Sequence, residues 1–245
     1  DELERDGYRI CAFEVDHGLT GLGYAFVEDP RPGVFDPDRA RELGVTPGPD
    51  FGRLQRGETV GGVRPDQVMG EQRRGRKVVL TGDTAPSDMT RLVAWEADLL
   101  VHEATFMEED AERARETRHS TAAGAAAVAA GAGVEMLALT HISPRYSGGQ
   151  VREEARGAFD NVVVPRDFDR IEVPFPERGG PVLVRASESP PEPVAEPSSP
   201  WGLVEAVQSV VMTTLPRVPW AKGSKAACSA YDSAMAGSRR RWCVR

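Results

Sequence analysis

Cysteine and long apolar runs are both scarce in this chain of 245 residues. The three cysteines, Cys11, Cys228 and Cys243, have neither zinc-site spacing nor a paired arrangement, which excludes a disulfide framework and favours a reducing compartment. No apolar run approaches the roughly 20 residues that span a bilayer, so we expect no membrane-spanning helix. The first residues lack the cationic and apolar regions of a signal peptide, and we therefore expect a cytoplasmic protein.

Positive charge is also in deficit, because the formal net charge is −8. This balance argues against a nucleic-acid partner, but the charge is unevenly distributed. Residues 31–77 contain ten lysines and arginines against seven acidic residues, and they end in the cluster RRGRK (Arg73–Lys77). A solvated loop is one interpretation of this cluster, and a surface that contacts phosphates is the other.

Composition divides the chain into a folded part and a polar remainder. Residues 1–186 alternate strand-like and helix-like stretches and end in two stretches typical of closing strands, FDRIEVPF and GGPVLVRA. Residues 187–200 are rich in proline, glutamate and serine, which predicts an extended linker. Residues 201–245 form a tail of unknown role, which we expect to be disordered.

Three short apolar runs each stop at a residue that can bind metal or move a proton. Continuous runs rich in valine and leucine predict buried strands of an α/β sheet, whose chemistry lies just past the strand ends. The first candidates for a site are therefore Asp83, His102, Glu103 and His141. The runs are KVVLTGD (Lys77–Asp83), ADLLVHE (Ala97–Glu103) and EMLALTH (Glu135–His141).

Two further segments predict helices with defined ends. In FDPDRARELG, Asp36 suits the N-cap, Pro37 the first helical position and Gly44 the left-handed residue after the last turn. The many glycines and prolines that follow predict an arm made of turns rather than a core element. In HSTAAGAAAVAAGAG, a cap at Ser120 or Thr121 would place His119 at the positive end of a small-residue helix.

Each candidate also has a purely structural interpretation. Asp83 could cap the following helix, His141 could be a core histidine, and His17 simply follows an apolar strand. Their combination favours a functional site, because histidine nitrogens with a carboxylate suit zinc, whereas carboxylates alone suit magnesium or calcium. His102 is interpreted as a buried structural residue of its strand and is left out of the site.

Taken in order, these motifs strongly resemble ribonuclease Z, the tRNA 3′-processing endonuclease of the metallo-β-lactamase fold. The resemblance extends from about Gly7 to Val173 and ends with Asp167-Phe168 before a last strand. It implies an α/β, metallo-β-lactamase-like αββα sandwich that is partial here, with residues 1–186 forming its C-terminal portion. The motifs are FEVDHGLTGLGYAFVEDPRPG, ELGVTPGPDFGRLQRGETV, VVLTGDT, ADLLVHEATF, RHSTAAGAAAVA and LTHISPRY.

The resemblance assigns metal-binding and catalytic roles. It implies that His17, Asp83 and His141 bind metal, with Asp83 shared between two zinc ions. His119 corresponds to a histidine that assists proton transfer, and Glu103 to the glutamate that orients it. Two zinc ions would bind the scissile phosphate, and cleavage would leave a 3′-hydroxyl on the tRNA.

The resemblance also assigns the substrate contacts and partners. Residues 31–77 correspond to the arm that grips tRNA, and precursor tRNA and a second copy of the chain are the implied partners. The implied substrate contacts are Ser143, Arg145 and Tyr146 in a phosphate-side loop, Gly48 and Pro49 in the arm, and the arginines Arg73, Arg74 and Arg76.

One expected motif is absent from this sequence. The family's His-x-His-x-Asp-His should lie upstream of Gly7, and without it each zinc would have two protein ligands rather than three or more. We therefore interpret the chain as N-terminally incomplete and expect it to be inactive by itself. The alternatives are a non-catalytic RNA-binding or dimerisation fragment and a different hydrolase of the same fold.

Overall fold

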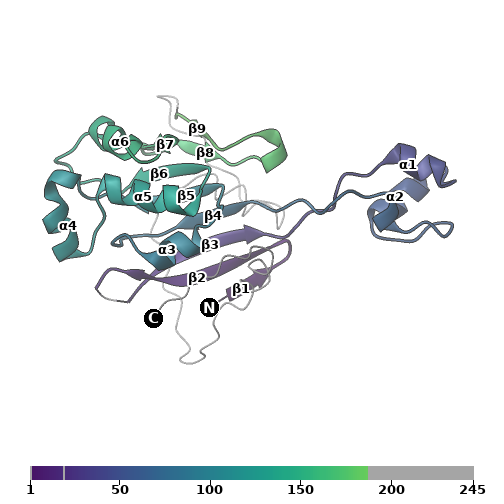
Figure 1. The fold of residues 1–245 in the computed structure, drawn as a ribbon, viewed down its shortest axis with the longest axis horizontal. Helices are drawn as coiled ribbons and strands as arrows, with labels where there is room; N and C mark the ends of the chain where they lie inside the picture. Colours follow the sequence, from purple (N-terminus) through teal and green to yellow (C-terminus); the bar gives the residue numbers. More distant parts are fainter. Residues whose placement is uncertain (1, 19, 187–245) are drawn as a thin grey trace.

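A seven-stranded sheet forms the centre of the computed structural model, which describes residues 2–18 and 20–186 (Figure 1). Its strands lie in chain order, antiparallel from β1 to β4 and parallel from β4 to β7. The three apolar runs are β4, β5 and β6, so the predicted α/β class is confirmed. The strands are β1 (Glu2–Arg5), β2 (Tyr8–Asp16), β3 (Thr20–Glu28), β4 (Lys77–Leu80), β5 (Leu99–Glu103), β6 (Met136–Thr140) and β7 (Val162–Val163).

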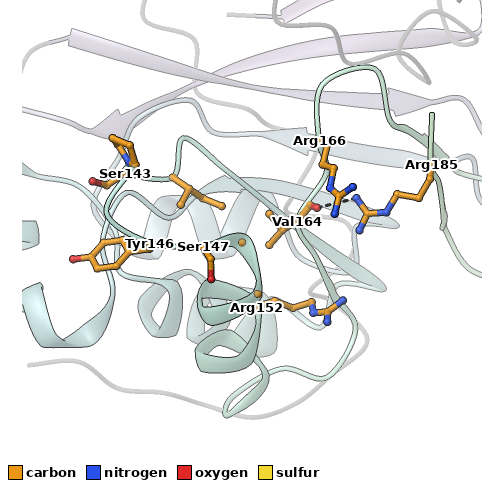
Figure 2. A pocket seen from close by; sticks show the side chains of 11 residues that line it. Ser143, Tyr146, Ser147, Arg152, Val164, Arg166 and Arg185 are labelled. Carbon is orange, nitrogen blue, oxygen red and sulfur yellow. Dashed lines mark hydrogen bonds between the residues drawn. The ribbon is translucent and has the colours of Figure 1, made fainter. Parts of the chain in front are cut away.

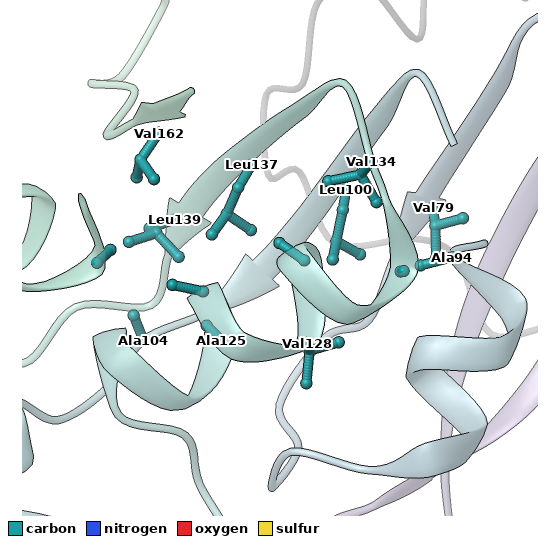
Figure 3. Packing of buried hydrophobic residues seen from close by; sticks show 14 of the residues in the cluster. Val79, Ala94, Leu100, Ala104, Ala125, Val128, Val134, Leu137, Leu139 and Val162 are labelled. Atoms are coloured by element: carbon teal, nitrogen blue, oxygen red, sulfur yellow. The ribbon is translucent and has the colours of Figure 1, made fainter. Parts of the chain in front are cut away.

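Helices cover one face of this sheet. Leu100, Leu137 and Leu139 point from β5 and β6 into a core that they share with Ala125 and Val128 (Figure 3). The last two belong to a helix rich in alanine, and its small side chains let it lie close against the strands. The helices of this layer are α3 (Asp88–Val93), α5 (Ala122–Ala132) and α6 (Gly148–Arg156), with α4 (Ala111–Thr117) beside them.

A second, two-stranded sheet packs on the opposite face. Leu99, Val101 and Ala138 point toward this side and form a core with Ile171 and Val173. The β5 and β6 strands are thus apolar on both faces, which explains why their sequence runs do not alternate. The two closing stretches are this second sheet, β8 (Arg170–Glu172) paired antiparallel with β9 (Val182–Val184). The described part therefore forms three layers: helices, large sheet and small sheet.

An arm projects from the sheet between β3 and β4 (Figure 1). We define the arm as residues 31–73, because an antiparallel bridge between Arg31 and Arg73 closes its root. The arm was predicted to consist of turns rather than to form a core element of the domain, and the structure adds a small apolar cluster of its own. Leu54, fully buried, packs with Val60, Val63 and other residues into a separate apolar cluster. Its helices are α1 (Pro37–Glu42) and α2 (Pro49–Gln55), followed by a 3₁₀ turn at Pro65–Gln67.

Helix ends follow the sequence signals. The Asp36 carboxylate caps α1 by accepting hydrogen bonds from the backbone N–H groups of Asp38 and Arg39, at 3.0 and 2.8 Å, and Gly44 has a φ of 85°. Thr121 caps α5 through the N–H of Gly124.

The polar remainder cannot be compared with its predictions. The linker at 187–200 and the tail at 201–245 lie outside the described residues. Within the described residues, none of the helices combines the length and the apolar character needed to span a bilayer.

Candidate active site

The candidate residues converge at the end of the sheet that lies opposite the arm. β4 begins shortly after the arm, and Asp83 lies just past the other end of that strand. His17 directly follows β2, and His141 directly follows β6. His119 precedes the cap of α5, as predicted. Ser87 caps α3, so Asp83 is not a helix cap and its side chain is available to the site.

Three histidine rings lie together in this place. The ring centre of His119 is 4.8 Å from that of His17 and 5.4 Å from that of His141. Asp83 Oδ1 lies 3.5 Å from His141 Nδ1. Possible ligand atoms of His17, Asp83 and His119 all lie within 4.8 Å of one another, as do those of Glu103, His119 and His141. The structure thus brings together all five predicted metal-binding and catalytic residues.

Glu103 is the buried centre of the hydrogen-bond network. Its Oε1 accepts bonds from His119 Nδ1 at 2.6 Å and from the backbone N–H of Thr84 at 2.9 Å. Its Oε2 accepts bonds from the Thr105 hydroxyl at 2.7 Å and from the N–H groups of Thr105 and Ser120 at 3.0 and 3.1 Å. Every partner is a donor, which suits the acceptor-only oxygens of a carboxylate. Glu103 is therefore rigidly held, and it fixes the orientation of His119.

Each of the three histidines has its Nδ1 beside an oxygen. His17 Nδ1 lies 3.1 Å from the Arg118 carbonyl oxygen, and His119 Nδ1 contacts Glu103. His141 Nδ1 lies 2.7 Å from the Thr105 hydroxyl, whose own hydrogen is directed to Glu103. Nδ1–H is then the donor in each ring, which leaves the lone pair on Nε2. Metal-binding histidines typically show this arrangement, in which the second nitrogen donates to an oxygen.

The donor set suits zinc. Imidazole nitrogen and carboxylate oxygen bind zinc at about 2.0–2.1 Å, so two ligands of one tetrahedral ion lie roughly 3.3 Å apart. Asp83 lies beside the His141 ring, but their 3.5 Å separation is measured at Nδ1, whereas Nε2 is the atom left free to bind an ion. Both side chains are partly exposed, so an ion can reach them from solvent.

Backbone strain and a cavity lie beside His141. His141 and Phe168 have positive φ angles, 52° and 68°, in a region that non-glycine residues rarely adopt. Both line a cavity of about 570 Å³ that also contains Asp167 and Arg166. Phe168 remains exposed, so its ring is accessible from the cavity side.

The predicted phosphate-side loop follows His141. The Ser143 N–H donates to the carbonyl of Thr105, which joins the loop to the segment that follows β5. The Tyr146 hydroxyl donates to Asp110, and Arg145 lies 3.6 Å from the same carboxylate. Burial, together with this hydrogen bond, raises the pKa of Tyr146 above its usual value.

The remaining predicted substrate residues lie far from the histidines. Gly48 and Pro49 form the start of α2 in the arm. Arg73 pairs with Glu177 at 2.9 Å, Arg74 with Asp98 at 2.7 Å, and Arg76 with Glu28 at 2.5 Å. The arginine cluster is therefore not simply a solvated loop, nor a surface whose arginines are all free to contact phosphates. Each guanidinium forms an ion pair that holds the arm root to the body. Its contact with phosphate stays a prediction.

Sequence reasoning missed the two threonines that complete the site. Thr105 contacts Glu103, His119 and His141, and Thr84 donates its N–H to Glu103. Thr105 stands in the HEATF motif, and its position there was the available signal. His102 is fully buried, donates Nδ1–H to the Glu103 carbonyl, and has a pKa lowered by burial, in agreement with a structural role.

Known proteins with similar sequences include ribonucleases Z. The chain is 51% identical over 183 residues to a ribonuclease Z of Halorubrum lacusprofundi, which covers 71% of this chain and 59% of the relative. It is also 51% identical over 180 residues to a ribonuclease Z of Gemmatimonas aurantiaca, which covers 70% of this chain and 57% of the relative. The chain thus spans less than two thirds of the length of these relatives. No protein-family model matches it.

Solved structures show more distant similarity. A metallo-beta-lactamase fold protein of Bacillus subtilis matches with a TM-score of 0.45 and 18% identity, over 68% of this chain and 50% of that protein. The short form of human tRNase Z matches with a TM-score of 0.41 and 23% identity, over 68% of this chain and 43% of that protein.

Proposed function

We propose that this chain, which is 51% identical to two ribonucleases Z over its matched residues, contributes the described site to a zinc-dependent endonuclease for precursor tRNA. The proposed reaction removes the 3′ trailer and leaves a 3′-hydroxyl on the tRNA. The observation that carries the proposal is the arrangement of the three histidines, each with Nδ1 beside an oxygen and Nε2 available.

We propose that His17, Asp83 and His141 hold the metal. Their nitrogen and oxygen atoms suit zinc better than magnesium, which prefers oxygen ligands alone. When bound, two zinc ions would supply positive charge at the scissile phosphate and an activated water. The chain's own contribution is to orient these ligands: Arg118 and Thr105 hold two of the rings.

His119 is proposed to move a proton. With Nδ1 donating to Glu103, a proton carried on Nε2 can pass to the 3′-oxygen of the tRNA as its bond to phosphorus breaks. The buried carboxylate stabilises the charged imidazole and prevents its rotation. Since Thr84, Thr105 and Ser120 saturate Glu103 with hydrogen bonds, the pair keeps one geometry.

The arm is proposed to bind the body of the tRNA. Its projection from the sheet supports this role (Figure 1), as does the excess of positive charge over residues 31–77, which comes from the cluster at the arm root because residues 31–73 are balanced in charge. Gly48 is the N-cap of α2 and Pro49 is its first residue, so both lie within the arm. The arginines at its root position the arm through ion pairs, and any phosphate contact would add to that role.

We also propose a cytoplasmic homodimer. The supporting observation is an exposed apolar face near α3, formed by Met89, Leu92 and Trp95 at a helical spacing. Monomeric proteins rarely leave such side chains grouped on the surface without a partner.

The test uses a chimera that adds the part of the Halorubrum lacusprofundi relative that this chain does not match. We expect it to cleave a 3′-extended tRNA transcript and to release a mature 3′-hydroxyl end. His119→Ala should lower kcat about a hundredfold, with zinc content unchanged, because only the proton donor is lost. Thr117→Ala, an exposed position of the same segment, is the control.

A second substrate distinguishes the competing functions. Bis(p-nitrophenyl) phosphate has a good leaving group, so it should be only mildly sensitive to His119→Ala. A chimera that binds tRNA but cleaves neither substrate would favour the RNA-binding fragment. Turnover of a chromogenic ester without tRNA cleavage would favour another hydrolase, and either result would contradict the proposal.

A further inference from the structure

A second cavity lies beside the candidate active site, at the start of α6 (Figure 2). It measures about 540 Å³. Ile142 and Arg166 line both this cavity and the one that contains His141, so the two adjoin. We call it the arginine cavity, and its other lining residues used below are Ser147, Gly148, Gly149, Arg152 and Arg185.

The lining of the arginine cavity is positively charged. It contains Arg152, Arg166 and Arg185 and no acidic residue, although the whole chain has a net charge of −8. The three arginines come from different segments: α6, the loop after β7, and the residue after β9. Figure 2 shows Arg166 and Arg185 directed toward each other across the upper part of the cavity. Arginines grouped without acidic lining residues favour a bound anion, although Asp169 balances the charge of Arg185 from behind the lining.

Two of these arginines form no ion pair with another described residue. Arg185 pairs with the buried Asp169 at 2.6 Å and serves the fold. Among the described residues, neither Arg152 nor Arg166 has a carboxylate within ion-pair distance of its guanidinium, in contrast to Arg73, Arg74 and Arg76 at the arm root. Their donors are therefore free to bind a phosphate, for which the planar guanidinium is well suited.

Backbone donors lie in the same cavity. Ser147 caps α6 through a reciprocal pair of bonds with Gln150, and Gly148 and Gly149 form its first turn. The N–H groups of these two glycines have no acceptor among the described residues. Because neither has a side chain, an anion can approach the first-turn N–H groups closely, where the helix dipole also favours negative charge.

We propose that the arginine cavity binds one nucleotide of the RNA strand next to the scissile bond, with its phosphate held by Arg152, Arg166 and the N–H groups of Gly148 and Gly149. The volume exceeds that of a phosphate ion, and Ile142 and Val164 supply apolar surface for a sugar or base. The proposal rests on the proposed function for the identity of the strand. The cavity lies, like His141, at the end of the sheet opposite the arm, and we assign the nucleotide to the trailer rather than to the tRNA body.

The first test uses the full chain and adenosine monophosphate as the probe. Titration followed by ¹⁵N NMR should shift the Gly148 and Gly149 amides and the Arg152 side chain. Inorganic phosphate should bind at least fivefold more weakly, since it leaves the apolar surface empty. The double variant Arg152→Gln/Arg166→Gln should weaken nucleotide binding tenfold or more.

The matched control is Arg156→Gln/Arg170→Gln, which removes the same charge from exposed positions on α6 and β8, outside the cavity. It should change affinity less than twofold. An equal loss in both variants would show a non-specific charge effect and overturn the proposal. Absence of shifts at Gly148 and Gly149, or equal affinity for phosphate, would also overturn it.

A second test separates this proposal from the proposed function. In the chimera, the Arg152→Gln/Arg166→Gln variant should raise KM at least fivefold for a tRNA with a ten-nucleotide trailer but less than twofold for a one-nucleotide trailer. Normal cleavage with no dependence on trailer length contradicts the trailer assignment alone. No cleavage by the unsubstituted chimera contradicts the proposed function, and the nucleotide titration still decides the cavity.

Discussion

Glu103 shows how a buried charge can be stabilised by its neighbours. Its side chain is about 1% exposed, and three backbone N–H groups, a hydroxyl and an imidazole donate to it. A buried carboxylate is costly unless such partners surround it, and each partner depends in turn on the acceptor. The same residue therefore contributes to stability and to the orientation of His119.

Replacement of Glu103 by glutamine should destabilise the fold. The amide NH₂ of glutamine would face donors, so at least one buried N–H group would lose its acceptor, at a cost of about 2–4 kcal/mol in the free energy of unfolding. Urea denaturation measures this change. Glu153→Gln on the exposed face of α6 should change it by less than about 0.5 kcal/mol. Equal stability of the two variants would contradict the role given to Glu103.

Asp83 has a different role, which metal affinity can measure. It is partly exposed and caps no helix, so Asp83→Asn should leave the melting temperature almost unchanged. Zinc affinity, measured by competition with a chromogenic chelator, should fall about 10- to 100-fold, because the charged ligand is lost. Asp88→Asn, an exposed residue of α3, is the matched control and should bind zinc like the parent chain. A loss shared by both variants would exclude a specific site at Asp83.

The arm is an element with its own small core. Leu54 is fully buried among arm residues alone, whereas Val34 lies exposed in the same arm. Leu54→Ala should lower the free energy of local unfolding of the arm by about 2–5 kcal/mol, which should be enough to unfold such a small cluster. Hydrogen exchange should then show loss of protection confined to residues 31–73, with the β5 and β6 amides unchanged. Val34→Ala should have no such effect, and a loss of protection across the sheet would show that arm and sheet unfold together.

Ion pairs join the root of the arm to the turn between β8 and β9. Arg31 donates two hydrogen bonds of 2.8 Å to Glu177, Arg73 adds a third, and the Arg31 guanidinium stacks 3.5 Å from the centre of the Phe175 ring. The bonds from Arg31 lower the pKa of Glu177 from 4.5 to about 2. Since the folded-state pKa is the lower one, this pairing stabilises the fold above about pH 5 and is lost as the pH falls toward 2.

The effect of pH on thermal stability follows from the lowered pKa of Glu177 in the folded state. The difference in melting temperature between the parent chain and Glu177→Gln should be constant from pH 8 to 5 and should shrink toward zero near pH 2. Glu172→Gln, an exposed position on β8, should show no such trend. A difference that persists unchanged at pH 2 would mean that the Glu177 pair does not link the arm root to protonation.

For the whole molecule, the exposed face formed by Met89, Leu92 and Trp95 predicts association. Sedimentation velocity should show a dimer for the parent chain, and Trp95→Glu should raise the dimer dissociation constant tenfold or more, because a buried charge at an apolar contact has no partner. Leu3→Glu, at a similarly exposed leucine on β1, should leave the dimer intact. A monomeric parent chain would exclude this interface.

The sequence by itself determined the features that depend on neighbours along the chain. The apolar runs predicted β4, β5 and β6, and Asp36, Pro37 and Gly44 predicted the limits of α1. Strand burial and helix capping involve residues within a few positions of one another, so their signals are local. The placement of Asp83 and His141 past strand ends was predictable for the same reason, since parallel strands bring their carboxyl ends to one edge.

Only the tertiary structure decided which distant residues meet. Thr105 contacts His141 across 36 positions, and Arg31 reaches Glu177 across 146. The pairing of Arg73, Arg74 and Arg76, the separate core of the arm and the adjoining cavities likewise depend on packing between segments. Composition alone counts every arginine as the same positive charge and does not show which of them has a carboxylate partner. Which guanidinium holds the fold and which remains available for phosphate is determined by the carboxylates that folding places beside it.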